Sequence, residues 1–278
     1  MKKYFLTKIL YIICIIFVII PCKAYALDIT VGATTWYAWG SRYENTNDGY
    51  GNNKRTNNNY AFDPSFLYGP AISVKFNDDF NLTFVYLYSK FDYTEKLHED
   101  YGGSLFVKSN IKRSDSDLTI NYKLNDYLKL FVGAKYLGYE IKLSNDDPMD
   151  EEHYYSNSRH NSIGPGLGLN CTCPITGNIF ILGTISGFYL FSPGEKFEDY
   201  YMYDRDRPTK ITIGYNEYGI NTNISVAYYI SQISTVISLG FRYQYFITDY
   251  KEYEPFLINN IKNQFFGITL TATYTFSL

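Results

Sequence analysis

The chain has 278 residues, a formal net charge of −3 and a hydrophobic fraction of 46%. It has no basic run or basic face, and this argues against nucleic acid as a partner. The composition is rich in aromatic residues, with 31 tyrosines and 20 phenylalanines. A chain of this length is sufficient for one domain.

The first part of the chain, 1–26, has the pattern of a secretory signal peptide. Lysines near its start are followed by an apolar run over 9–20 and by the small-x-small motif Ala24-Tyr25-Ala26. The apolar run is too short for a comfortable membrane-spanning helix. We therefore expect cleavage after Ala26 and a single mature domain over 27–278. An anchor acylated at Cys22 and a retained apolar anchor are the alternatives.

Ten segments of the mature chain alternate apolar and polar residues. In chain order, the predicted strands cover 28–39, 66–76, 80–92, 113–124, 127–143, 162–173, 178–191, 213–230, 233–246 and 264–278. A period of two is typical of a strand with one face in apolar surroundings and the other in polar surroundings. Segment 178–191 is apolar on both faces, so its sequence alone does not show which residues face inward and which face outward.

The breaks between the predicted strands are alternately short and long. The short breaks cover 77–79, 125–126, 174–178 and 231–232, and the long polar ones cover 40–63, 93–112, 144–161, 192–212 and 248–263. This alternation is typical of transmembrane β-barrels, which have short periplasmic turns and long extracellular loops. A sheet in lipid must also close, because every backbone group has to be paired.

We therefore predict an all-β fold, a transmembrane antiparallel up-and-down β-barrel of about ten strands. An even number of strands places both termini at the end with the short turns, which is the periplasmic end. Splitting the segment 213–230, or adding a hairpin within 40–63, would give the alternative of twelve strands.

The predicted strand 127–143 changes its apolar face part-way along. Its apolar positions alternate from Leu128 to Tyr136 and then shift by one residue to Tyr139 and Ile141. One extra residue in a strand turns every later side chain to the opposite face. We therefore predict a β-bulge near Gly138.

The last segment resembles the C-terminal targeting strand of bacterial outer-membrane β-barrel proteins. Tyr274 and Phe276 hold alternate positions, and Leu278 stands where the family pattern usually has Phe. The resemblance covers the whole chain at the level of architecture and identifies no subfamily. It implies a bacterial outer-membrane location, with the barrel-assembly machinery and outer-membrane lipid as partners. We expect a monomer.

Charged and polar residues occupy the predicted inner face of the barrel. These candidate lumen residues are Lys75, Asp117, Lys123, Lys129, Lys135, Glu217, Arg242 and Gln244. The interior of a ten-stranded barrel is narrow enough for side chains largely to fill it. Opposed charges in that interior would pair, because an unpaired buried charge is costly. A structural polar network that plugs the barrel is our first interpretation, and a small or gated pore is the second.

An enzyme must be considered because the chain is similar to the omptin proteases in size and strand number. That family uses an acidic pair and an Asp-His pair near the extracellular rim, and Asp115 and Asp117 resemble the acidic half. His98, His153 and His160 fall in predicted loops, and none belongs to an Asp-x-His motif. A general base must lie within hydrogen-bond reach of its water. We therefore predict no enzymatic activity, catalytic residue, cofactor or metal, with an omptin-like rim hydrolase as a distant alternative.

The long loops are the remaining place for a function. The stretches 197–207 and 249–256 combine tyrosines with charged residues. This composition suits a surface that binds an extracellular ligand or a host surface, and it equally suits strands that continue above the membrane. We predict a surface barrel with a structural or binding role, and a small-solute or ion pore as the alternative.

Overall fold

A computed structural model of the chain describes residues 27–47, 55–98, 104–145, 155–192, 195–200, 209–250 and 257–277. The predicted signal peptide lies outside the described residues. No helix in the described part is long and apolar enough to cross a membrane. The strands are β1 (Asp28–Asn47), β2 (Arg55–Lys75), β3 (Phe80–His98), β4 (Ser104–Lys123), β5 (Leu128–Asn145), β6 (Tyr155–Pro174), β7 (Ile179–Phe191), β8 (Glu195–Tyr200), β9 (Thr209–Ile213), β10 (Tyr215–Ile230), β11 (Thr235–Tyr250) and β12 (Leu257–Ser277).

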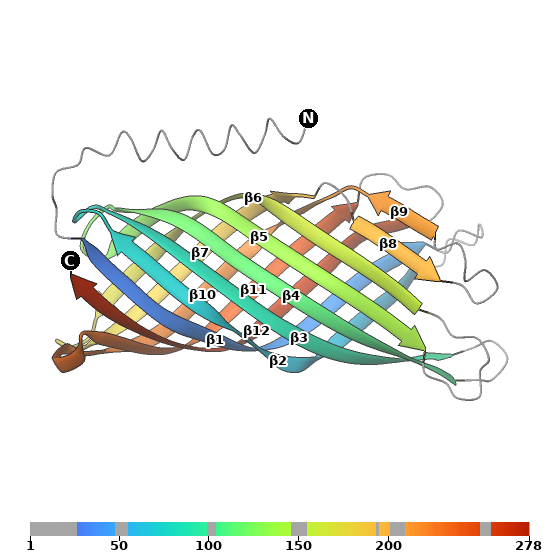
Figure 1. The fold of residues 1–278 in the computed structure, drawn as a ribbon, viewed down its shortest axis with the longest axis horizontal. Helices are drawn as coiled ribbons and strands as arrows, with labels where there is room; N and C mark the ends of the chain where they lie inside the picture. The colour runs from blue at the N-terminus through green and yellow to red at the C-terminus, as the bar shows by residue number, and fades with distance from the viewer. Residues whose placement is uncertain are drawn as a thin grey trace.

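Ten of these strands form a closed antiparallel barrel (Figure 1). Each strand pairs with its neighbours in the order β1 to β7, β10, β11 and β12, and β12 pairs back to β1 from Asp28↔Ser277 onward. Closure removes the free edges that an open sheet would expose to lipid. The predicted fold class and the number of ten strands are confirmed.

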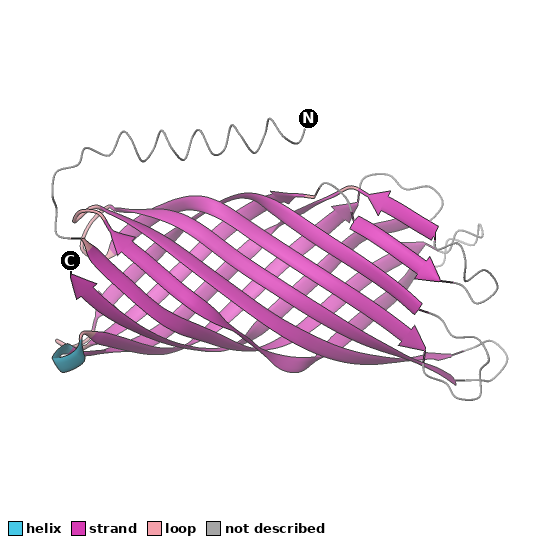
Figure 2. Ribbon diagram, viewed as in Figure 1, coloured by secondary structure: helices cyan, strands magenta, loops and turns pink. Residues whose placement is uncertain are grey.

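Short turns gather at one end of the barrel, where β1 begins and β12 ends (Figure 2). The side-chain oxygen of Asn77 accepts hydrogen bonds from the backbone amides of Asp79 and Phe80, at 2.9 and 2.8 Å. Asn125 caps the turn between β4 and β5 in the same way. Such Asx turns explain why Asn begins both of these tight reversals. The β10–β11 turn contains the short 3₁₀ helix η2 (Ser231–Ile233).

Much of the sequence predicted as long loops is strand in the structure. Strands β1 and β2 continue into the predicted loop 40–63 and pair as far as Asn47↔Arg55. The predicted loop 192–212 contains the hairpin β8–β9, and β8 pairs with the start of β6 (Figure 1). Outside a bilayer both faces of a strand tolerate polar residues, so the alternation that identifies a strand disappears. The sheet thus has twelve strands, but the closed wall has ten.

Large apolar side chains cover the outer face of the barrel. On β10 the exposed fractions are 45% for Ile220, 59% for Ile224 and 54% for Val226. A continuous apolar surface of this kind is typical of a barrel that faces lipid. The structure also assigns the faces of β7, because Phe188 and Leu190 are buried inside whereas Ile185 is exposed outside.

The β-bulge predicted near Gly138 is wrong. Strand β5 keeps an unbroken register through this residue, which lies opposite Ser114 on β4 and Asn161 on β6. The apolar parity changes because the surroundings change: Leu137 is fully buried inside the barrel, whereas Glu140 faces outward. Towards the short turns β5 has an apolar outer face and a mostly polar inner face, and beyond Gly138 its apolar side chains face inward and its polar ones outward.

A real register shift occurs on β2 instead. Ala38 pairs with Ser65 and Gly40 pairs with Phe62, so two β2 residues lie opposite the single β1 residue between them. One of the two is Pro64. Proline has no N–H to donate to the ladder, and a bulge is one of the few places in a sheet that accept it.

We expect the folded protein to be heat-modifiable in SDS gel electrophoresis. Because closure pairs the backbone groups of the wall internally, SDS alone should leave the barrel compact, and boiling should unfold it. The unboiled sample should therefore migrate faster than the boiled one. Identical migration, together with extraction into aqueous buffer without detergent, would contradict the membrane barrel.

Candidate functional site

Five buried side chains cross the interior of the barrel as one ionic group, called here the charged layer. The layer consists of Arg113, Asp115, Lys135, Arg242 and Gln244. The Asp115 carboxylate is 1% exposed and lies 2.6 Å from Lys135 Nζ, 3.1 Å from Arg113 Nη2 and 3.4 Å from Arg242 Nη2. The Gln244 amide donates to the same carboxylate at 3.4 Å. One acidic group thus holds three cations from three strands.

Asp117 lies one inward position closer to the short turns and supplies a second negative charge. Its carboxylate is 3.1 Å from Lys135 Nζ, and its side chain is 32% exposed. Lys135 therefore bridges a fully buried and a partly exposed carboxylate. Burying charges without partners would cost several kcal/mol for each ion, so this pairing is what makes the layer tolerable.

Aromatic rings surround the two guanidinium groups of the charged layer. The Arg113 guanidinium carbon lies 3.9 Å from the centre of the Phe265 ring, and that of Arg242 lies 4.6 Å from Trp36. Within the described part of the chain, Nε and Nη1 of Arg113 have no hydrogen-bond partner. Cation–π contacts offset part of this loss, because the ring faces carry negative potential.

An inner aromatic cluster continues the filling of the lumen next to the charged layer. It contains Trp36, Ala38, Phe62, Leu67, Leu87, Phe91, Ile111, Leu137, Phe188, Leu190, Phe246 and Phe265. Phe246 and Phe265 stack at 6.2 Å with their planes 9° apart. These residues come from eight strands of the wall, so the cluster is a hydrophobic core placed inside the barrel.

The residues predicted for the lumen fall into separate groups. Asp117, Lys135, Arg242 and Gln244 lie in or beside the charged layer. Lys75, Lys123 and Lys129 lie at the end with the short turns, where Lys75 pairs with Asp78 at 2.8 Å and Lys123 pairs with Asp126 at 2.7 Å. Glu217 belongs to a third group, described below.

Sequence reasoning missed Arg113 and Asp115 as lumen residues. Asp115 was considered only as half of a catalytic pair at the rim. The signal that could have found them is parity, since both share the inward face of β4 with Asp117.

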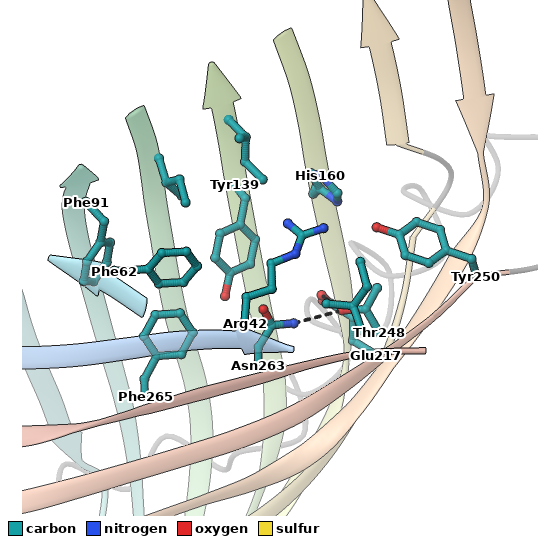
Figure 3. A pocket seen from close by; sticks show the side chains of 13 residues that line it. Arg42, Phe62, Phe91, Tyr139, His160, Glu217, Thr248, Tyr250, Asn263 and Phe265 are labelled. Atoms are coloured by element: carbon teal, nitrogen blue, oxygen red, sulfur yellow. Dashed lines mark hydrogen bonds between the residues drawn. The ribbon is translucent and has the colours of Figure 1, made fainter. Parts of the chain in front are cut away.

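A small pocket lies beside the inner aromatic cluster, and Figure 3 shows the side chains that line it. One wall is apolar and includes Phe62, Phe91 and Phe265, and the other is polar and includes Arg42 and Glu217. Tyr139 and His160 also line the pocket. The pocket thus has one apolar and one polar side, and its volume of about 30 Å³ is enough for about two water molecules.

Glu217 and His160 are both buried in the polar wall of this pocket, with exposed fractions of 2% and 6%. The Glu217 carboxylate accepts hydrogen bonds from Ser162 and, at 3.1 Å, from Thr248. The Ser158 hydroxyl lies 3.4 Å from His160 Nε2.

The predicted loop positions of two histidines are wrong. His160 lies inside the barrel on β6, because this strand begins well within the predicted loop 144–161. His98 is the last residue of β3. His153 lies outside the described residues.

Two of the residues in the predicted barrel-assembly signal lie on the outer face of β12. The rings of Tyr274 and Phe276 stack with their centres 6.2 Å apart. Their outward position leaves both rings available at the end of the barrel where β12 finishes. Leu278 lies outside the described residues.

The chain has the fold of bacterial outer-membrane β-barrels. It resembles the outer membrane protease OmpT of Escherichia coli with a TM-score of 0.53 and 12% identity, over 91% of this chain and 99% of that one. The translocator domain of the autotransporter NalP of Neisseria meningitidis gives 0.42 and 9%, over 91% and 90%. OprG of Pseudomonas aeruginosa gives 0.39 and 12%, over 91% and 97%. No family model and no curated protein matches the sequence. The similarity therefore establishes the fold and leaves the function to the site.

We expect Asp115→Ala to destabilise the protein by about 3–5 kcal/mol, because it leaves three buried cations without their shared partner. Asp117→Ala is the matched control and should cost no more than about 1 kcal/mol, since this partly exposed carboxylate contacts one cation. Urea unfolding in detergent, followed by tryptophan fluorescence, measures both values. Equal losses in the two variants would contradict the central role of Asp115.

Proposed function

We propose that this chain is a non-enzymatic barrel of a bacterial outer membrane that has a closed lumen and acts by binding at its loop end. The observation that carries the proposal is the filled interior: Asp115 is 1% exposed, and Trp36 and Leu137 are fully buried beside it. A conducting barrel needs a continuous polar path. Here an ionic group and a hydrophobic core lie across that path.

The apolar outer face supports the membrane location. Its exposed side chains on β5 and β10 include Val132, Ile220, Ile224 and Val226. A spanning strand needs roughly 9–11 residues, which matches the outward apolar run of β5 from Leu128 to Tyr136. With the usual orientation of such barrels, the short turns and both termini are periplasmic and the long hairpins are extracellular.

A small-solute pore is the second candidate function. Lys75, Lys123 and Lys129 lie at the end with the short turns, and Lys129 is exposed. Such a basic mouth would attract anions into the lower lumen. The path from this mouth leads to the charged layer, and for this reason we place the closed barrel first.

The arrangement of the acidic residues supports a non-enzymatic role. Asp115 and Asp117, the pair that resembles half of an omptin site, are both held by Lys135. A carboxylate that neutralises buried cations is poorly suited to activate a water molecule.

Binding at the loop end is supported by the pocket and by the hairpins above it. The pocket offers apolar rings on one side and polar groups, including Arg42 and Glu217, on the other. The β8–β9 hairpin extends the wall at that end (Figure 1). We propose an extracellular ligand or host surface as the partner, and a monomer as the working form.

We expect the reconstituted protein to produce no stable unitary conductance steps in planar bilayers. Stable steps should appear in a variant that combines Arg113→Ala, Phe246→Ala and Phe265→Ala. The reason is that these substitutions remove large side chains that block the centre of the lumen. The outward-facing Ile224→Ala is the control and should stay silent. Stable steps from the unchanged protein, altered in size by Lys129→Glu, would overturn the closed barrel and favour the pore.

We also expect no cleavage across a broad peptide library. The reason is the ion pairing of Asp115 and Asp117, which leaves the omptin-like pair without free carboxylates. Cleavage that disappears in Asp117→Ala, or in His160→Ala within the pocket, would contradict the non-enzymatic proposal. Folding of each variant is checked by heat-modifiable migration.

A further inference from the structure

Four basic side chains gather on the outer surface of the barrel, on strands β3 to β6. Three of them, Lys90, Lys112 and Arg159, lie in a single row across these strands, with the acidic Glu140 between Lys112 and Arg159. Lys142 lies two residues beyond Glu140 on the same face of β5. We call Lys112, Glu140, Lys142 and Arg159 the outer basic cluster.

Glu140 holds the other members of the outer basic cluster together. Its carboxylate lies 3.2 Å from Lys112 Nζ, 3.7 Å from Lys142 Nζ and 3.7 Å from Arg159 Nη2. Burial raises the pKa of Glu140, but the hydrogen bond from Lys112 and the charges of Arg159 and Lys142 outweigh it and hold the pKa below its ordinary value. The carboxylate therefore stays charged at neutral pH and positions three cations that would otherwise repel one another.

The charge of this surface remains positive when the described side chains on the outer face of β3 to β6 are counted. Three cations surround one carboxylate in the outer basic cluster, and the exposed Lys90 adds a further positive charge. Asp92, on the same outer face of β3, subtracts one and accepts a hydrogen bond from Asn110 at 2.7 Å. The side chains stay accessible: Arg159 is 63% exposed and Lys142 is 42% exposed.

The height of the cluster on the wall identifies the kind of partner. The outward apolar run of β5 ends at Tyr136, and Glu140 is the second outward position after it. At the rise and tilt of barrel strands, this places Glu140 roughly 9 Å above that tyrosine. The polar headgroups occupy roughly 5–8 Å outside the hydrocarbon on each side of a bilayer. The cations thus lie at or just above the phosphates of lipids that pack against the apolar outer face of the barrel, called here the apolar belt.

We propose that the outer basic cluster is a binding site for the phosphate groups of a phosphorylated lipid in the leaflet at the loop end. Lys112 and Lys142 act as point charges, and Arg159 offers the planar fork of donors that matches a phosphate. The acyl chains of the lipid lie against the belt below, beside Ile163 and Leu167, which are 54% and 59% exposed. The inference rests on the membrane location proposed above and is independent of whether the lumen is closed.

The experiment is a lipid titration of the detergent-solubilised full barrel, read by native mass spectrometry as the fraction of protein that carries one lipid. The probes are diphosphorylated lipid A, the same lipid with its phosphates removed, and inorganic phosphate. We expect retention of the phosphorylated lipid alone. Equal retention of the dephosphorylated lipid would overturn the proposal, and so would saturation of the site by inorganic phosphate with no preference for the lipid.

Variants of the cluster give the second arm of the test. A cation near a lipid surface contributes about 1 kcal/mol, so Arg159→Gln should weaken binding about fivefold. Replacing Lys112, Lys142 and Arg159 together by Gln should weaken it about 100-fold. Lys262→Gln is the matched control, because this exposed outward lysine lies on β12, opposite Tyr43 and Ile247 and away from the cluster. Unchanged binding in the triple variant, with normal heat-modifiable migration, would overturn the site.

Conductance measurements keep this proposal separate from the closed lumen. If lipid retention does not depend on the phosphate groups and the protein shows no conductance steps, the proposed lipid site is wrong and the proposal of a closed lumen is kept. If lipid retention requires the phosphate groups but the protein conducts, the proposal of a closed lumen is wrong and the proposed lipid site is kept.

Discussion

The pairing of β1 with β12 is the constraint on which the rest of the structure depends. The other neighbours in the wall follow one another along the chain, apart from the inserted hairpin β8–β9, so this contact alone joins the two ends of the sheet. In lipid an open edge would leave a row of backbone groups without partners, at a cost of several kcal/mol for each group. Closure removes that cost and fixes the diameter of the barrel. It also creates an enclosed interior that must itself be filled.

How that interior is filled explains the unusual distribution of side chains. A barrel of ten strands is narrow, so large inward residues from facing strands meet across the lumen. On the loop side they are aromatic and aliphatic, such as Phe246 and Phe265, and form a core. Towards the short turns several of them are small and polar, such as Thr119 and Ser186, although Phe131 is also buried there. The charged layer around Asp115 lies next to this core, where its cations meet both carboxylates and aromatic rings.

The fold was largely predictable because lipid imposes a strict pattern. Where one face meets hydrocarbon and the other meets polar side chains, alternation marks the strand and its parity, and the faces of β4 and β10 follow from it. The pattern failed where the surroundings changed. At Gly138 the apolar face moves from outside to inside, and alternation alone cannot distinguish that exchange from a bulge. The same change hid the upper parts of the strands and placed His160 in a loop.

The candidate site was predictable only in its parts. Parity placed Asp117, Lys135, Arg242 and Gln244 on the inner face, but it carries no information about height relative to a distant strand. The shear of the closed sheet decides which inward residues share a level. It brings β4, β5 and β11 together at Asp115 and leaves Lys75, Lys123 and Lys129 at the mouth. Likewise, the cross-strand row that gathers three cations on Glu140 depends on register.

By itself, the sequence determined the class of fold, the number of strands in the wall and the face of most residues within the apolar belt. These features are local, since each follows from a period of two and from the residues that form tight turns. Only the tertiary structure decided that the lumen is crossed by a charged layer and an aromatic core, that Arg113 belongs to that layer, and that the basic residues outside form one cluster. Each of these depends on contacts between strands far apart in the chain, and closure and register set those contacts.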